Sequence, residues 1–301
     1  MYKVTSLWAH QDSVKVEWNL GKRCNYDCSY CPESIHDNNS PHTDIDILKS
    51  AVDKLVEIGR PIRLSFTGGE PTVHPKFEEL LYYARVKGIN WISITTNGTR
   101  TPEWYINNQA LYNHLTFSLH FEHDWQRVIT TIIRLKEQLE RDFFVNIMAH
   151  HDKMTEVHEA VRWCTALDIK YAIRRVRWTE GDHNLFDDLR YNLDDLNWIL
   201  EHDATAPDNC VTEDKEKNIK LYHANDIIKL HLNNFKGWRC SAGIESLMIN
   251  WDGDVHRATC RVGGSLGNIY TGSFNIPTEY ITCTRDWCTC AADIPLTKFS
   301  L

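Results

Sequence analysis

The sequence predicts an α/β protein: a partial (β/α)6 barrel of the TIM type, followed by a small Cys-rich β-hairpin/α extension. Two observations lead to this prediction. Strand-like and helix-like segments alternate six times with short connections, which is typical of parallel βαβ units. After residue 238 the pattern changes to a hairpin signal with five cysteines. Six units are two short of a closed (β/α)8 barrel, so we expect an open one.

Composition limits the classes of protein that need to be considered. The 301 residues suffice for one large domain, or for one domain with an appendage, and 42% hydrophobic with 25% charged residues is ordinary for a soluble globular protein. Apolar runs are too short to cross a bilayer and residues 1–13 lack a signal-peptide pattern. We therefore expect a cytoplasmic protein without a membrane partner, whose ten cysteines bind metal rather than form disulfides. The net charge of −8 disfavours nucleic acid as a partner.

We divide the chain into three regions by these patterns. Residues 1–179 form the predicted barrel, residues 180–237 a polar helical linker, and residues 238–301 the Cys-rich domain. Within the linker, helices are expected over residues 193–202 and 219–232.

The barrel elements follow from hydrophobic periodicity and helix-end signals. In the first strand, Val16 and Trp18 alternate with Lys15 and Glu17, so the two sets face opposite sides. The pair Thr43 and Asp46 resembles a capping box that opens the first helix, and Gly59 ends it. The predicted strands are 14–20, 61–67, 91–96, 115–121, 143–150 and 169–178, and the later predicted helices begin near Pro75, Pro102, Glu122 and Thr155.

The later strands have one apolar and one polar face. In the second strand, for example, Leu64 and Phe66 alternate with Arg63 and Ser65. Parallel strands that are buried on both faces normally read as continuous apolar runs. We therefore predict a polar, ligand-filled interior, with ligands at the carboxyl ends of the strands. A register slip of one residue would exchange the two faces, but several strands agree on the assignment.

The first strand leads directly into three cysteines, Cys24, Cys28 and Cys31, in the spacing C-x3-C-x2-C. A loop this short can direct three sulfurs at one point. A [4Fe–4S] cluster normally takes four thiolates, so three would leave one iron open to another ligand. The alternative is a structural zinc ion whose fourth ligand is His36 or His42.

Two motifs together resemble the radical S-adenosylmethionine (radical SAM) superfamily. They are the cysteine loop with Tyr30 before its last cysteine, and the segment Thr67-Gly68-Gly69-Glu70-Pro71 at the end of the second strand. The resemblance implies a [4Fe–4S] cluster on the three cysteines, with SAM chelating the open iron and the Gly-Gly-Glu-Pro segment contacting the SAM ammonium. An electron from the cluster would cleave SAM to a 5′-deoxyadenosyl radical. The implied catalytic residues are Cys24, Cys28, Cys31 and Glu70.

Other polar residues at strand ends are candidate SAM contacts. Thr96 and Asn97 end the third predicted strand, and the resemblance implies that Ser118, His120 and one strand-six arginine contact the SAM ribose or carboxylate. His120 and His150 could instead act on substrate as acid or base. The arginine candidates are Arg174, Arg175 and Arg177, of which we choose Arg174. The complete predicted cofactor-binding set is Tyr30, Gly68, Gly69, Glu70, Pro71, Thr96, Asn97, Ser118, His120 and Arg174.

The C-terminal cysteines surround a predicted hairpin at residues 247–255, with Asp252-Gly253 as its turn. Cys240 precedes the hairpin, Cys260 closes it, and Cys283, Cys288 and Cys290 follow. The pattern resembles the SPASM/Twitch extensions of radical SAM enzymes, which hold auxiliary [4Fe–4S] clusters. The SPASM pattern uses seven cysteines, so five imply one auxiliary cluster. Cys240 and Cys260 would be joined by two of the later three, or by all three if one of the first pair is free. Structural zinc is the alternative, and Cys164 and Cys210 are expected to be ordinary residues.

The predicted function is a radical SAM enzyme that abstracts hydrogen from a substrate, with the auxiliary cluster transferring electrons or ligating substrate. The substrate would be a peptide precursor or a nucleotide- or sugar-like small molecule, and the electron donor a flavodoxin or ferredoxin. The sequence has no spare N-terminal segment for a leader-peptide-binding domain, which weakens the peptide interpretation. The alternative is a non-catalytic iron–sulfur or zinc protein, either an electron carrier or a metal-stapled binding module. Such a protein would have a fully ligated first site and no affinity for SAM.

Overall fold

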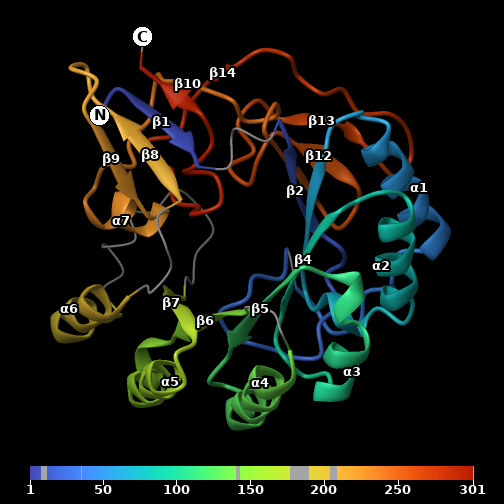
Figure 1. The fold of residues 1–301 in the computed structure, drawn as a ribbon, viewed down its shortest axis with the longest axis vertical. Helices are drawn as coiled ribbons and strands as arrows, with labels where there is room; N and C mark the ends of the chain where they lie inside the picture. The colour runs from blue at the N-terminus through green and yellow to red at the C-terminus, as the bar shows by residue number, and fades with distance from the viewer. Residues whose placement is uncertain (8–11, 35, 140–142, 177–189, 204–208, 301) are drawn as a thin grey trace.

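The computed structural model describes residues 1–7, 12–34, 36–139, 143–176, 190–203 and 209–300. Its described strands form a nine-stranded sheet and a six-stranded sheet (Figure 1). Among these residues, no helix is both long enough and apolar enough to cross a membrane.

The larger sheet has the strand order β13-β12-β11-β2-β3-β4-β5-β6-β7. From β11 to β7 all neighbouring strands pair in parallel. The six predicted strands are confirmed at closely matching bounds, while closure into a partial barrel stays a prediction. They are β2 Val14–Asn19, β3 Ile62–Thr67, β4 Trp91–Thr96, β5 His114–Leu119, β6 Phe143–Ala149 and β7 Lys170–Arg175.

Five helices connect these parallel strands and lie along one side of the sheet (Figure 1). The predicted N-cap of the first helix is wrong by one residue. Asp44, not Thr43, occupies the cap, because its side chain accepts a hydrogen bond from the Asp46 N–H at 2.8 Å. The helices are α1 Ile45–Val56, α2 Phe77–Val86, α3 Pro102–Asn107, α4 Trp125–Gln138 and α5 Met154–Ala166.

The predicted faces of the parallel strands are confirmed. Leu64, Phe66 and Ile94 are completely buried in the core against the helices. Their neighbours Arg63 and Ser65 remain partly accessible on the other face, where they line a cavity of about 480 Å³ near the amino ends of the strands. The sheet therefore packs on one face only and leaves its second face polar and hollowed.

The six-stranded antiparallel sheet draws strands from all three regions of the chain, in the order β14-β10-β15-β1-β8-β9. Helix α6 (Leu193–His202) has its predicted bounds, but the helix predicted over residues 219–232 is wrong at its start. Residues Ile219–Tyr222 form strand β9, and helix α7 covers only Ala224–Lys229. The other strands are β1 Lys3–Ser6, β8 Cys210–Glu213, β10 Arg239–Cys240, β14 Ile281–Thr282 and β15 Lys298–Phe299.

The predicted C-terminal hairpin is confirmed as β11 (Ser246–Ile249) and β12 (Asp254–His256). Gly253 in the turn has a φ of +84°, which a residue with a side chain rarely adopts. Strand β11 also pairs in parallel with β2, from Ser246 opposite Lys15 to Ile249 opposite Trp18. The C-terminal segment is thereby attached directly to the strand that precedes the cysteine loop, and β13 (Ser265–Asn268) extends the sheet beyond it.

Candidate functional site

A cavity of about 160 Å³ lies at the carboxyl ends of strands β2 to β5. It collects residues from the cysteine loop, from the turn after β3 and from the ends of β4 and β5. The predicted residues that line it are Cys24, Cys28, Cys31, Gly68, Gly69, Glu70, Thr96, Asn97, Ser118 and His120. Residues as far apart in the sequence as Cys24 and His120 therefore face one space, as parallel α/β folds place their ligand sites.

The glycine turn packs backbone against backbone on the segment that leads into Cys24. The Gly69 N–H donates to the Gly21 carbonyl at 2.8 Å, and the Glu70 N–H donates to the Arg23 carbonyl at 3.0 Å. A Cβ on Gly69 would lie 2.3 Å from the Lys22 carbonyl oxygen, so only glycine fits. This contact fixes the turn and the cysteine loop relative to each other. Pro71, the last residue of the motif, starts a single 3₁₀ turn and is buried.

Glu70 is buried and accepts hydrogen bonds from its own turn and from the carboxyl end of β4. Its Oε1 accepts from the Thr72 hydroxyl at 2.6 Å and from the Thr96 hydroxyl at 2.8 Å. Its Oε2 accepts from the Asn97 N–H at 2.6 Å. Burial raises the pKa of Glu70, while these hydrogen bonds favour the charged form and act in the opposite direction.

Tyr30 and His120 form a hydrogen-bonded pair beside the cysteine loop. The Tyr30 hydroxyl lies 2.6 Å from His120 Nδ1, and the Cys28 sulfur lies 3.5 Å from the same nitrogen. Burial lowers the pKa of His120 to about 4 and raises the pKa of Tyr30, so the imidazole is neutral and the phenol protonated at neutral pH. The hydrogen bond between the phenol and Nδ1 fixes the orientation of the His120 ring.

Three residues that the sequence analysis did not assign also hold this loop in place. Glu122 accepts from the Ser29 N–H at 2.7 Å, and Asn25 accepts from the Asn97 side-chain amide at 2.8 Å. Tyr26 stacks on the His123 ring with 3.9 Å between ring centres. Glu122 lies just beyond the end of β5, so the rule that ligand sites collect at strand ends could have identified it.

The histidines proposed as zinc or proton-transfer groups occupy different places. His36 lines the cavity, and its Nε2 lies 2.6 Å from the Tyr26 carbonyl oxygen. His42 packs edge to face on His74 at 4.9 Å between ring centres. His150 lies behind the loop with its Nε2 3.5 Å from Glu122, and it does not line this cavity.

Arg174 does not lie where the sequence analysis placed it. Its guanidinium donates to Asn146 at 3.2 Å and to Asn225 at 2.7 Å, and it lines a different cavity beside α6 and α7. The assignment of Arg174 to SAM is therefore corrected. Arg175 lines that second cavity as well, and Arg177 is outside the described residues.

Four of the C-terminal cysteines line one small cavity of about 30 Å³. They are Cys240, Cys260, Cys283 and Cys288. Cys290 is not part of that lining. Cys164 and Cys210 are completely buried in α5 and β8, as expected of ordinary apolar residues.

A buried cation accompanies these four thiols. Lys298 is 2% exposed, and its ammonium donates to the Asp293 carbonyl at 2.8 Å and lies 4.6 Å from the centre of the Phe235 ring. Burial lowers the pKa of Lys298, but the charges of the Cys288 and Cys240 sulfurs outweigh it and raise that pKa. A fully buried ammonium needs nearby negative charge, which the Asp293 carboxylate in the same lining supplies in part and thiolates in this cavity would add to.

Comparison with known proteins finds a family that part of the chain resembles. Residues 18–164, which contain the cavity at the strand ends, match the Radical SAM superfamily. The matched segment covers the radical SAM motifs but ends before the C-terminal cysteines.

Curated relatives share this radical SAM segment. The chain is 40% identical over 87 residues to Fe-coproporphyrin III synthase of Methanosarcina barkeri, covering 28% of this chain and 21% of that protein. It is 26% identical over 155 residues to GTP 3′,8-cyclase of Stenotrophomonas maltophilia, covering 50% and 42% of the two chains. The matches thus span less than half the length of these relatives.

The fold extends further than the sequence similarity. The structure of Streptococcus suis SuiB bound to precursor peptide SuiA superposes with a TM-score of 0.58 at 16% identity, over 86% of this chain and 63% of that one. The shared architecture therefore covers the radical SAM region and part of the C-terminal region.

Proposed function

We propose that this protein is an enzyme that reductively cleaves SAM and uses the resulting 5′-deoxyadenosyl radical to abstract hydrogen from a substrate. The observation that carries the proposal is the single cavity that joins three loop thiols to Glu70, Asn97 and the glycine turn. Relatives named as a synthase and a cyclase favour an enzyme over a non-catalytic iron–sulfur or zinc protein.

The residues of the cavity have the chemistry that the two cofactors need. Cys24, Cys28 and Cys31 would hold a [4Fe–4S] cluster, whose open iron binds SAM and supplies the electron that cleaves it. The Tyr26 N–H, which lies 3.4 Å from the Cys24 sulfur, would donate to that thiolate. Burial raises the pKa of Cys24 to about 11, so the thiol becomes a ligand only when iron displaces its proton.

The turn after β3 would bind the amino-acid part of SAM. Glu70 lines the cavity, and hydrogen bonds from Thr72, Thr96 and Asn97 orient its carboxylate. Such fixed hydrogen bonds keep the carboxylate from rotating, so it can meet an ammonium group without reorganisation.

An auxiliary [4Fe–4S] cluster on Cys240, Cys260, Cys283 and Cys288 is the second part of the proposal. Four thiols around one cavity satisfy the normal ligand count of such a cluster. The buried ammonium of Lys298 supports an anionic cluster there. Since Cys290 does not line this cavity, we assign it no ligand role.

The substrate is proposed only as a class: a peptide or a small molecule of the nucleotide or sugar type. Support for each comes from a relative, since SuiB is seen bound to a precursor peptide and another relative is named for its action on GTP. We also propose a flavodoxin- or ferredoxin-like electron donor, because the cleavage consumes an electron that the chain does not generate.

The decisive experiment is anaerobic incubation of the reconstituted protein with dithionite and SAM, followed by measurement of 5′-deoxyadenosine. We expect product from the wild type and none from Cys28→Ala. If the wild type with an intact cluster makes no product, and SAM leaves the EPR signal of that cluster unchanged, the proposal is wrong.

A further inference from the structure

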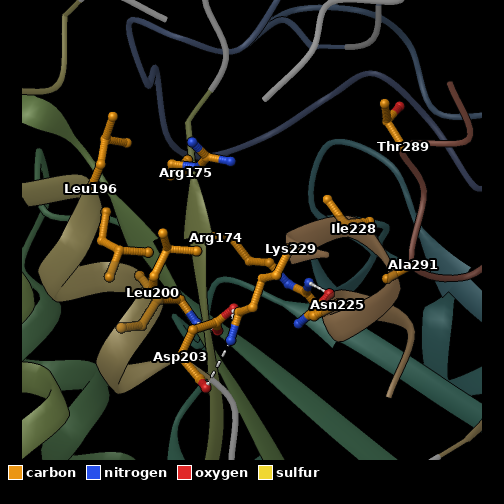
Figure 2. Close-up of a pocket in the computed structure, with 12 residues that line it drawn as sticks. Arg174, Arg175, Leu196, Leu200, Asp203, Asn225, Ile228, Lys229, Thr289 and Ala291 are labelled. Carbon is orange, nitrogen blue, oxygen red and sulfur yellow. Dashed lines mark hydrogen bonds and ion pairs between the residues drawn. The ribbon is translucent and has the colours of Figure 1, made fainter. Parts of the chain in front are cut away.

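The cavity that Arg174 lines, of about 130 Å³, lies between strand β7, helices α6 and α7, and the segment that carries the last cysteines. Figure 2 shows Arg174 and Arg175 entering it from β7, and Asn225 and Lys229 from α7. Thr289, which separates Cys288 from Cys290, lies on its far side. None of the roles proposed above uses this cavity.

Arg174 contributes a cation whose hydrogen bonds go to neutral groups, while the charge of Asp203 in the same cavity favours its charged form without a direct contact. Within the described part of the chain its guanidinium makes no ion pair, and it donates to the neutral amide oxygens of Asn146 and Asn225. Burial lowers the pKa of Arg174, which reflects the cost of keeping its charge away from water. A guanidinium in this position gains most from an anion that completes its hydrogen bonds.

Asn225 adds a buried donor that is left without an acceptor. The residue is 5% exposed, and its amide oxygen is occupied by Arg174 at 2.7 Å. Its Nδ2, in the described part of the protein, has no hydrogen-bond partner. A buried amide N–H without a partner costs free energy, so this donor also calls for an acceptor from a ligand.

The charges and the apolar wall define what that ligand is. Arg174, Arg175 and Lys229 line the cavity with the carboxylate of Asp203. Lys229 is paired with Asp203 at 3.5 Å and with Asp226 at 3.9 Å, so the positive charge offered to a ligand is mainly that of Arg174. Asp203 is already engaged, because it accepts from the Ile173 N–H at 2.8 Å and lies 3.5 Å from Lys229. The remaining lining includes the apolar side chains of Ile199, Leu200 and Ile228. A ligand that carries an oxyanion on an apolar chain would match both the cationic and the apolar part of this lining.

We propose that this cavity binds a carboxylate of the substrate and so anchors it beside the radical-generating site. The inference rests on the proposed function for the identity of the ligand as substrate. A planar carboxylate presents two oxygens to the donors of Arg174 and Asn225, with the apolar part of the molecule against α6.

The position of the cavity suits such an anchor. Val176, which follows the arginine pair at the end of β7, packs on Cys28 and Tyr30 of the first proposed cluster site. On the opposite side, Thr289 connects the cavity to Cys288 of the auxiliary site. A substrate held here by its carboxylate would lie between the two sites.

The test measures binding by calorimetry on the reconstituted holoprotein without SAM, with hexanoate, its neutral isostere hexanamide, and inorganic phosphate as probes. We expect hexanoate to bind at least about tenfold more tightly than either of the others, since charge-assisted hydrogen bonds are lost with hexanamide. Phosphate binding more tightly than hexanoate, or equal binding of hexanoate and hexanamide, would overturn the carboxylate assignment.

Variants locate the site. Arg174→Gln should weaken hexanoate binding about tenfold or more, and Asn225→Asp should abolish it, because the new carboxylate would occupy Arg174 itself. Asn225→Asp also covers the possibility that Arg174→Gln fails to fold, since it supplies the missing ion pair. Arg134→Gln, on the exposed face of α4 beside Glu103, should leave binding unchanged. Wild-type binding by both folded variants would refute the site.

The outcome is separate from that of the proposed function. Hexanoate binding is measured without SAM cleavage, and 5′-deoxyadenosine formation is measured without hexanoate. Variant-sensitive hexanoate binding in a protein that never cleaves SAM would support the carboxylate site and reject the radical mechanism. SAM cleavage without hexanoate binding would do the reverse.

Discussion

The Oε2 atom of Glu70 accepts a hydrogen bond from the backbone N–H of Asn97 at 2.6 Å, and this contact joins the turn after β3 to the loop after β4. Asn97 in turn donates from its side chain to Asn25 in the cysteine loop at 2.8 Å. The buried Glu70 carboxylate and Asn97 thereby link three segments that surround the proposed SAM site: the turn after β3, the loop after β4 and the cysteine loop. Its loss should affect both the fold and the chemistry.

We predict that Glu70→Gln lowers the free energy of unfolding by about 1–3 kcal/mol and greatly reduces 5′-deoxyadenosine formation. The NH₂ group of the glutamine would face a hydrogen-bond donor in either orientation, the Asn97 N–H or a threonine hydroxyl. Urea unfolding and the anaerobic cleavage assay measure the two effects. The control is Glu79→Gln, which removes exposed ion pairs to Lys49 and Lys76 and should cost less than about 1 kcal/mol. Equal effects of the two substitutions would contradict the prediction.

Gly69→Ala should displace the cysteine loop, because its Cβ would meet the Lys22 and Arg23 carbonyl oxygens at 2.3 and 2.4 Å. We expect iron content to fall from about eight to about four atoms per chain, since only the auxiliary cluster would assemble. Iron analysis after anaerobic reconstitution tests this. Gly272→Ala, where a Cβ meets nothing within 4 Å, should retain the full iron content. Full iron content in both would disprove the role of the turn.

Variants of Cys288 and Cys290 distinguish between the alternative ligand sets that the sequence allows for the auxiliary cluster. Because Cys288 lines the four-thiol cavity and Cys290 does not, Cys288→Ala should lose or convert the auxiliary cluster while Cys290→Ala keeps it. Mössbauer and EPR spectra of each variant distinguish the outcomes. The opposite pattern would show that Cys290 is the ligand.

Lys298→Met should lower the reduction potential of the auxiliary cluster, since a buried positive charge stabilises the more negative, reduced state. The apolar stem of methionine fills a similar volume beside Phe235. An EPR-monitored redox titration should show this change in the auxiliary signal alone, with the potential of the first cluster unchanged. An unchanged auxiliary potential would place the cluster away from Lys298.

We predict that the stability of the protein depends on pH through His158, which lies outside both proposed cluster sites. Burial lowers its pKa below 6.5, its Nε2 has no partner among the described residues, and its ring stacks on Trp198 at 3.8 Å. A lowered pKa in the folded state means that stability present above pH 6.5 is lost as pH falls toward the folded pKa.

The test compares urea midpoints at pH 7.5 and 5.5. His158→Phe keeps the stacking and should lose less stability on acidification than the wild type. His202→Phe replaces an exposed ring that stacks on the same Trp198 and should retain the wild-type response. Parallel curves for all three proteins would show that His158 does not contribute.

The sequence predicted the parallel strands and most of the cavity because both depend on local patterns. Alternation of apolar Leu64 and Phe66 with polar neighbours fixes a strand and its faces within a few residues. The cysteine loop and the glycine turn follow those strands directly, so parallel topology alone brings them together.

The errors arose where distant segments decide the structure. Ile219–Tyr222 has the apolar content of a helix start, but it forms an edge strand because β8 pairs with it. Arg174 was assigned to SAM from its strand position. In the structure its side chain donates to Asn225 on α7 and lines another cavity, and the position of α7 could not be predicted from the sequence.

The pairing of β11 with β2 has a consequence for how the protein is made. Strand β2 leads into Cys24, yet its outer neighbour lies about 230 residues further along the chain and is synthesised much later. Until then that edge of the nascent sheet is open beside three reactive thiols, and long-range pairings of this kind form slowly. Premature termination upstream of residue 246 should therefore yield a protein prone to aggregate through that edge.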